Sequence, residues 1–107
     1  MRIAIAIFAL LIALCVSGAV QTEPTGGRVS IVSVRPYSSG LIYLEVSSSE
    51  FCGTSVFAFS STEVNGKEMY AAALTALATG KEVRLEASTA TGCTGWATRL
   101  QSIYLYN

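Results

Sequence analysis

Apolar and polar residues alternate in several segments of the chain after residue 27, which predicts a mainly β protein. The alternating segments, bounded by turn-forming residues, are 28–35, 41–47, 55–60, 81–88 and 100–107. Within 28–35 the apolar residues change face midway, since Val29 and Ile31 share one side while Val32 and Val34 share the other. Such a change is typical of a bulged strand or of one that serves two sheets.

The spacing becomes helical between the third and fourth of these segments. Asn65 with Glu68 three residues later forms a capping-box pattern at the start of a helix, and Gly80 provides its C-terminal stop. The apolar stripe expected to face the core consists of Met69, Tyr70, Ala73, Leu74 and Leu77. One helix is therefore predicted between strands three and four.

This order of elements is typical of a five-stranded Greek-key barrel of the oligonucleotide/oligosaccharide-binding (OB) type. A sheet with one packed helix is the alternative arrangement of the same elements. We expect the barrel domain to span residues 28–107, after a loose polar lead at 20–27. Two glycines and Pro24 in that lead indicate an irregular backbone.

The N-terminus has the three parts of a secretory signal peptide. Arg2 precedes an apolar run from Ile3 to Val16, and the small residues Ser17 and Ala19 follow, so cleavage is expected after Ala19. A membrane anchor is the alternative, but the run is shorter than the ~20 residues that a bilayer core requires. Lipidation of Cys15 is disfavoured by the large Leu14 before it. We therefore expect a secreted or periplasmic protein without a membrane span after processing.

The two cysteines that remain after processing, Cys52 and Cys93, are expected to form a disulfide. An even pair in an exported chain meets an oxidising compartment, where disulfides persist. A metal site or a redox pair is the alternative, but the chain has no histidine and no closely spaced cysteines.

The residue types present argue against enzymatic activity. Without histidine, Ser-His-Asp and Cys-His arrangements are impossible, and after processing every carboxylate side chain is a glutamate. Glu82 and Glu86 flank Arg84 on one predicted strand, as on a solvated face. Neither a cofactor nor a metal is expected. The basic residues are scattered, which disfavours nucleic acid as a partner.

Binding through exposed aromatic side chains is the more plausible activity. On an OB barrel the strand 2–3 face and its flanking loops bind ligands, which makes Tyr37, Ser38, Tyr43 and Trp96 the candidate residues there. Each aromatic residue has an alternative role: Tyr37 could cover the barrel end, and Tyr43 could lie in a subunit interface. For Trp96 we prefer a plug beneath the disulfide over a ligand contact.

The helix and the last strand suggest assembly into a homo-oligomer. No charged residue follows Glu68 in the helix, whereas an exposed helix face normally carries Lys and Glu. Small side chains on that face allow another chain to approach closely, and outward tyrosines suit an interface. The candidate interface residues are Ala72, Thr75, Ala76, Thr79, Tyr104 and Tyr106. A short helix made of good helix formers explains the same composition without assembly.

The predicted helix ends in Thr-Gly before a strand of the form x-V-R-L in "ATGKEVRL", Ala78–Leu85, and "GGRVSIVSV" leads into the first predicted strand. Both segments resemble the corresponding parts of the B subunits of subtilase-cytotoxin-type bacterial toxins. The resemblance covers about half of the processed chain. It implies an OB barrel, a ring of five B chains that binds sialylated glycans, and an exported toxin A chain as partner. It also implies a sugar-binding role for Thr25.

The chain departs from that family in its shorter length, its fewer cysteines and the stretch "TATGCTGWATRL", which replaces an aromatic-rich segment. Taken together, these features predict an exported, oligomeric glycan-binding module. The alternative is an exported interaction domain, an adaptor or an inhibitor, that binds a protein partner and no sugar.

Overall fold

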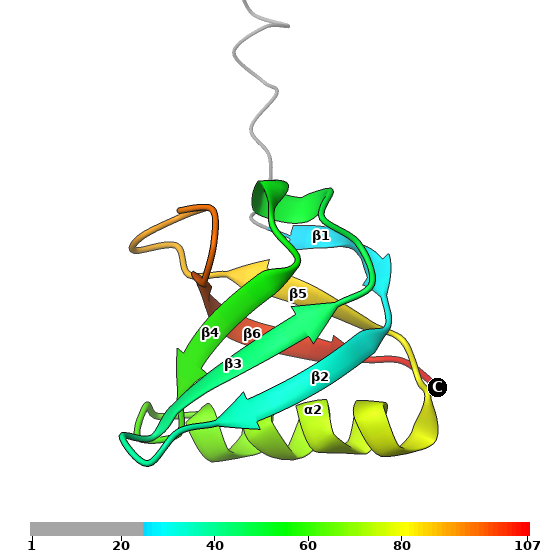
Figure 1. Cartoon of the computed structure of the whole chain (residues 1–107), viewed down its shortest axis with the longest axis horizontal. Helices are drawn as coiled ribbons and strands as arrows, with labels where there is room; N and C mark the ends of the chain where they lie inside the picture. The colour runs from blue at the N-terminus through cyan, green and yellow to red at the C-terminus, as the bar shows by residue number, and fades with distance from the viewer. Residues whose placement is uncertain (1–24) are drawn as a thin grey trace, which may run out of the picture.

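The structure, a computed structural model, describes residues 25–107 and has six strands and one α-helix within that range. The elements are β1 (Thr25–Val29), β2 (Ile31–Pro36), β3 (Leu41–Val46), the 3-10 turn η1 (Phe51–Gly53), β4 (Val56–Ser60), α2 (Gly66–Thr79), β5 (Val83–Ala87) and β6 (Thr98–Leu105). Figure 1 shows β2, β3 and β4 side by side, with β1, β5 and β6 behind them. The prediction of a mainly β protein with one helix between strands is therefore confirmed for the described residues. The signal peptide predicted at 1–19 lies outside them.

The strands form a mixed sheet in the order β1-β5-β6-β4-β3-β2. All neighbours are antiparallel except β4 and β6, which run parallel with Phe57 opposite Thr98. The expected closed five-stranded Greek-key barrel is wrong, because there are six strands and the edge strands β1 and β2 do not pair with each other. β1 also begins at Thr25, inside the segment predicted to be a loose lead.

The predicted first strand is divided at Ser30, close to the change of face that follows Ile31. Ser30 donates its backbone N–H to Ser47 Oγ at 3.0 Å, and its carbonyl accepts the N–H of Ser47 at the same distance. β1 then pairs with β5, whereas β2 pairs with β3, and each pairing contains a register shift. The face change thus predicted a real break, which directs one segment to two partners.

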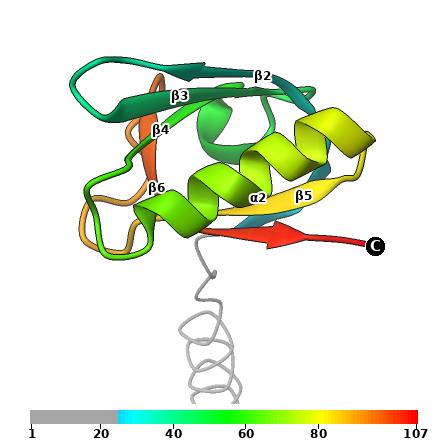
Figure 2. The same cartoon turned by 90° about the horizontal axis from the view of Figure 1, so that it is seen from below.

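The core lies between the curved sheet and α2, which crosses one end of the sheet (Figure 2). Its largest fully buried side chains come from β3, β4, β5 and β6, and they are Phe57, Phe59, Ile42, Leu44, Leu85, Leu100, Val83 and Thr98. In β3 and β5 buried and accessible residues alternate, as the period of a strand requires.

The helix has the predicted bounds, and its buried face matches the predicted stripe in part, since Tyr70 packs half-buried against the core as expected. Met69, Ala73 and Ala76 are buried, whereas Leu74 and Leu77, expected in the core, are 41% and 40% exposed. At the start of the helix the chain is closely packed, since a Cβ added at Gly66 would overlap the carbonyl oxygen of Ser60. The buried side of the helix thus consists of Met69 and two alanines, and the two leucines lie on the outer side.

The helix ends are partly as predicted. Gly80 adopts a left-handed conformation with φ 72° and donates its N–H to Ala76 O at 2.9 Å, which confirms the C-terminal stop. Asn65 precedes the helix, but its side chain makes no capping hydrogen bond. Its amide Nδ2 instead donates to Gln101 O at 3.0 Å and so ties the start of α2 to β6.

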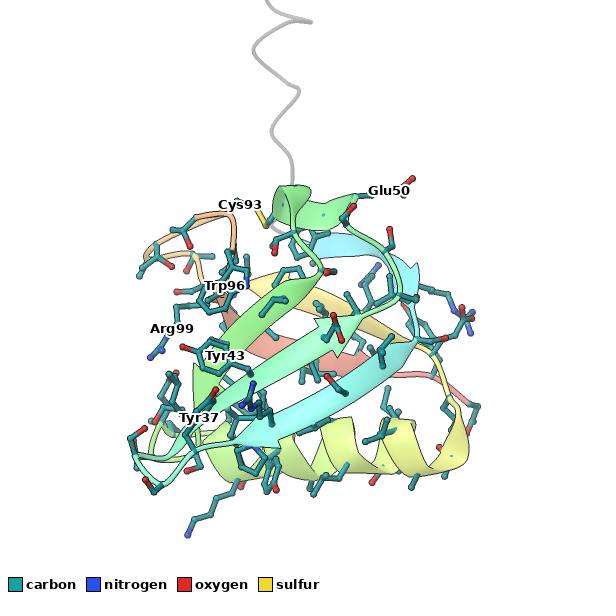
Figure 3. All side chains as sticks on the ribbon, in the orientation of Figure 1. Tyr37, Tyr43, Glu50, Cys93, Trp96 and Arg99 are labelled. Atoms are coloured by element: carbon teal, nitrogen blue, oxygen red, sulfur yellow. A yellow bond between two sulfur atoms is a disulfide. The ribbon has the colours of Figure 1, made fainter. Side chains whose placement is uncertain are left out.

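The predicted disulfide between Cys52 and Cys93 is present, with 5.1 Å between the two Cα atoms. It connects η1 to the β5–β6 loop, and Figure 3 shows Cys93 beside that turn. No helix within residues 25–107 is long and apolar enough to cross a membrane.

Candidate functional site

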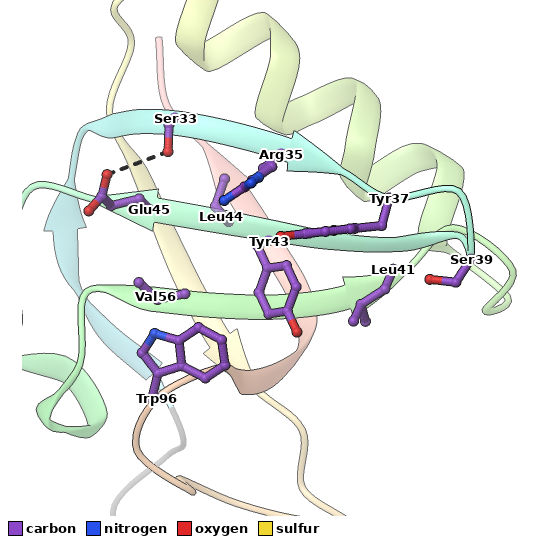
Figure 4. Close-up of a pocket in the computed structure, with 10 residues that line it drawn as sticks. All are labelled: Ser33, Arg35, Tyr37, Ser39, Leu41, Tyr43, Leu44, Glu45, Val56 and Trp96. Carbon is purple, nitrogen blue, oxygen red and sulfur yellow. Dashed lines mark hydrogen bonds between the residues drawn. The ribbon is translucent and has the colours of Figure 1, made fainter.

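Three aromatic side chains that are distant in the sequence form a continuous row on the outer face of the β2–β3–β4 strands (Figure 4). The ring centroids of Tyr37 and Tyr43 are 5.2 Å apart, and their planes lie nearly perpendicular, at 81°. The centroids of Tyr43 and Trp96 are 5.3 Å apart with a tilt of 35°. Both separations lie in the range of favourable aromatic pairs, so each ring helps to hold its neighbour.

The first two rings are oriented by regular backbone structure. Tyr43 lies in β3 between the buried residues Ile42 and Leu44, so the alternation of the strand directs its side chain outward. Tyr37 begins the turn after β2, where its N–H donates to Leu41 O at 2.8 Å and its carbonyl accepts the N–H of Gly40 at 3.0 Å. Gly40 has φ 89°, a conformation that favours glycine.

The third ring comes from the β5–β6 loop, whose backbone is fixed around it. The neighbours of Trp96, Gly95 and Ala97, both have positive φ, 78° and 63°. Ala97 donates its N–H to Val56 O at 3.0 Å, which attaches the loop to β4. The hydroxyl of Thr98, fully buried, donates to Gly95 O at 2.7 Å and accepts the N–H of Thr94 at 3.0 Å. The backbone at Trp96 is thus held by contacts within the loop and to β4.

Trp96 is 68% exposed, so its interpretation as a plug beneath the disulfide is wrong. Its indole lies over the outer surface beside Tyr43 and projects away from the core (Figure 4). Ala58 is opposite Tyr43 in the sheet, and because its neighbours in β4 face the core, its own side chain points to the outer face. It is nevertheless only 2% exposed. An alanine at this outward position leaves space for the rings above it.

The aromatic row lines a surface concavity of about 410 Å³. Its lining residues are Ser33, Arg35, Tyr37, Ser39, Leu41, Tyr43, Leu44, Glu45, Val56 and Trp96. The volume is within the range of small-molecule sites, and an aromatic lining with a few polar groups is also typical of them. The Arg35 guanidinium carbon lies 5.3 Å from the Tyr37 ring centroid, within the range of a cation–π contact.

The predicted ligand residues divide into those that reach this concavity and those that do not. Tyr37, Tyr43 and Trp96 come together there, whereas the neighbouring Ser39, not Ser38, lines it. Thr25 does not line the concavity; it begins β1, opposite Glu86 of β5.

Sequence reasoning missed Arg35 and Glu45 as site residues. Arg35 is opposite Tyr43 in the β2–β3 pairing, and Glu45 is two residues further along β3 from Tyr43. The two-residue period could have placed both side chains on the face of Tyr43.

The structure also bears on the proposed oligomer interface. Ala76 is 1% exposed and packs in the core, so it cannot meet a partner chain as expected. The hydroxyls of Thr75 and Thr79 are used within the helix, since they donate to the carbonyls of Ala71 and Thr75. Ala72, the remaining helical residue of the predicted interface, is half-buried.

The outward tyrosines of β6 and the C-terminal residues pair with arginines of their own chain. The guanidinium of Arg84 lies 4.5 Å from the Tyr104 ring centroid, and that of Arg28 lies 4.1 Å from the Tyr106 ring centroid. These tyrosines therefore already have cation–π partners, which lowers the need for a second chain to cover them.

Among residues 25–107 there is no group of three or more side chains that could hold a metal ion. No model of a known protein family, no curated protein and no solved structure matches the chain. The fold and the site thus define the class of the molecule on their own. It is a disulfide-linked, mainly β domain with an aromatic-lined concavity on its outer sheet face.

Proposed function

We propose that this protein is an exported glycan-binding module and that the concavity beside Tyr37, Tyr43 and Trp96 receives the sugar. The continuous row of three rings, with the indole 68% exposed, is the observation that carries the proposal. The apolar face of a pyranose stacks on aromatic rings, while polar side chains beside the rings bind its hydroxyls. Ser33, Ser39 and Glu45 provide such groups here.

The fixed backbone around the rings supports this function. A tyrosine or a tryptophan presents a large area with few rotatable bonds, so little conformational entropy is lost when a ligand binds. The edge-to-face and tilted contacts between the rings restrict them further. Export, inferred from the N-terminal pattern, agrees with the disulfide, because oxidising compartments preserve such bonds.

Assembly into a homo-oligomer, by analogy a ring of five with a toxin A chain, is part of the same proposal. Support comes from the outer side of α2, where Leu74 and Leu77 are exposed and no charged residue follows Glu68. Neighbouring exposed leucines on a helix surface without charges are typical of an interface. The same surface favours the second candidate function, an exported adaptor or inhibitor that binds a protein partner without sugar.

The single tryptophan of the chain makes the glycan proposal directly testable. The processed protein is applied to a glycan array, and binding saccharides are then titrated while the Trp96 fluorescence is recorded. Binding with a saturable change in emission is expected, since the indole lines the site. A protein that binds no saccharide, and whose emission no saccharide changes, would show that the glycan proposal is wrong. Capture of a protein partner through α2 would then favour the second function.

A further inference from the structure

The concavity contains two opposite charges that are not paired with each other. Arg35 extends from β2 and Glu45 from β3, and both side chains are exposed and line the site. In the strand pairing, Arg35 is opposite Tyr43, and Ser33 is opposite Glu45. The two charged residues are therefore diagonal neighbours on one face, a relation that places Cα atoms roughly 7–8 Å apart.

Neither group has an ion-pair partner within residues 25–107. The ion pairs in that range are Arg28 with Glu82 at 3.3 Å and Arg99 with Glu63 at 3.2 Å, both outside the concavity. The Glu45 carboxylate accepts one long hydrogen bond, from Ser33 Oγ at 3.5 Å. A carboxylate has about four acceptor positions and a guanidinium five N–H donors, so most of their capacity remains free.

The two charged side chains lie at different places around the concavity (Figure 4). Glu45 lies at the end that it shares with Ser33, Arg35 lies toward Tyr37, and Tyr43 and Trp96 form the wall below them. A ligand ring against Tyr43 and Trp96 would thus have a negative group at one edge and a positive group at another. The aromatic faces also favour a cation, because their quadrupoles attract positive charge.

We propose that the site selects a zwitterionic saccharide, with an ammonium group directed to Glu45 and an acidic group directed to Arg35. This inference rests on the proposed glycan-binding function and narrows its ligand class. A neutral sugar satisfies the acceptors of Glu45 but leaves the guanidinium of Arg35 without an anion. A purely acidic sugar pairs with Arg35 and is repelled by Glu45. A purely cationic sugar pairs with Glu45 and is repelled by Arg35.

Four probes built on one glucopyranose ring separate these contributions. Muramic acid carries both charges, N-acetylmuramic acid only the negative one, glucosamine only the positive one, and N-acetylglucosamine neither. Each is titrated against the processed protein at about pH 6, where the amine is protonated and the carboxylate ionised, with Trp96 emission as the signal. Muramic acid is expected to bind about fivefold more tightly than either singly charged sugar, the scale of one partly exposed ion pair.

Two variants assign the charges to their residues. Glu45→Gln should reduce muramic acid binding about fivefold and leave N-acetylmuramic acid unaffected or tighter, because the repulsion is removed. Arg35→Gln should reduce muramic acid binding by a similar factor and leave glucosamine unaffected or tighter. Glu50→Gln is the matched control, since Glu50 is an exposed glutamate far from Tyr37 in Figure 3 and does not line the concavity.

Each outcome decides between the proposals. If the four sugars bind equally, or if a singly charged sugar binds most tightly, the zwitterion inference is overturned while glycan binding stands. If none of the four binds but the glycan array identifies neutral or purely acidic saccharides, the inference fails in the same way. If no saccharide binds at all, the proposed function itself fails. Both substituted residues are exposed, and unchanged thermal unfolding of each variant confirms that a loss of binding is not a loss of fold.

Discussion

Removal of the disulfide by the double change Cys52→Ser and Cys93→Ser is expected to destabilise the domain strongly while sparing the site. The bond joins residues 41 positions apart, and the rest of the described domain has one small core. Restricting a loop of this length in the unfolded chain contributes about 4 kcal/mol to the free energy of unfolding. For a domain below 100 residues, that loss corresponds to a decrease in Tm of about 20 °C.

The site should survive because its loop has contacts that do not depend on the bond. Ala97 remains attached to Val56, and the hydroxyl of Thr98 still bridges Thr94 and Gly95. At temperatures well below its Tm, the double serine variant should therefore bind a saccharide ligand with an affinity within about threefold of the parent, a difference below 1 kcal/mol.

The assay combines urea unfolding, followed by far-UV circular dichroism, with a ligand titration of both proteins in the folded range. The parent treated with a reductant provides a second comparison without any substitution. A loss of less than about 1 kcal/mol would refute the argument from loop entropy. A folded variant that no longer binds would instead show that the disulfide, and not the contacts of Ala97 and Thr98, positions the indole.

Three further predictions concern the loop, the helix and the aromatic row. Thr98→Val keeps a side chain of similar shape but removes two hydrogen bonds, so it should lower the free energy of unfolding by about 2 kcal/mol. It should also weaken saccharide binding; urea unfolding and fluorescence titration measure the two effects. Gly66→Ala should lower the free energy of unfolding by about 1–3 kcal/mol in the same unfolding assay, because the new Cβ would overlap the Ser60 carbonyl oxygen. Tyr37→Ala should weaken saccharide binding about tenfold, whereas Tyr104→Ala, at an equal exposure of 43%, should not. Equal effects of the two tyrosine changes would contradict the assigned site.

The sequence pattern predicted which elements exist better than how they assemble. Alternation located β3 and β5, and helical spacing with Gly80 located α2, because these signals depend on residues close together in the chain. Whether the sheet closes depends on pairings between distant strands, which no local period encodes. The face change in 28–35 was the exception, since a break there divides β1 from β2 and directs them to different partners.

The helix shows why apolar character alone misplaced the buried face. The predicted stripe of apolar residues at helical spacing correctly includes Met69 and Ala73, but it also includes Leu74 and Leu77, which are exposed. Ala76, which was assigned to the outer side of the helix, is buried instead, so the buried face is rotated away from the two leucines. A single sequence does not show which of two adjacent sides of such a helix packs against the sheet.

The aromatic row was predictable in membership but not in geometry. Tyr43 follows from strand alternation, while the direction of Trp96 depends on the positive φ of the two residues that flank it, Gly95 and Ala97. Glycine signals such a conformation, but alanine adopts it rarely and at a cost of about 1 kcal/mol. The sequence thus correctly predicted that a disulfide from Cys93 attaches this loop to Cys52. It did not predict on which side of the loop the indole lies.

The backbone features that orient the three aromatic rings are independent of one another and of any ligand. Strand alternation directs Tyr43, the turn closed at Gly40 directs Tyr37, and the hydrogen bonds of Ala97 and Thr98 direct the loop of Trp96. A site whose backbone is held by separate contacts does not need to be ordered by its ligand, so binding loses little conformational entropy. The polar groups at its edge, in contrast, are exposed side chains that keep most of their hydrogen-bonding capacity. In the proposed function, the aromatic wall would bind the apolar face of a sugar ring, and Arg35 and Glu45 would select among such sugars by their charge.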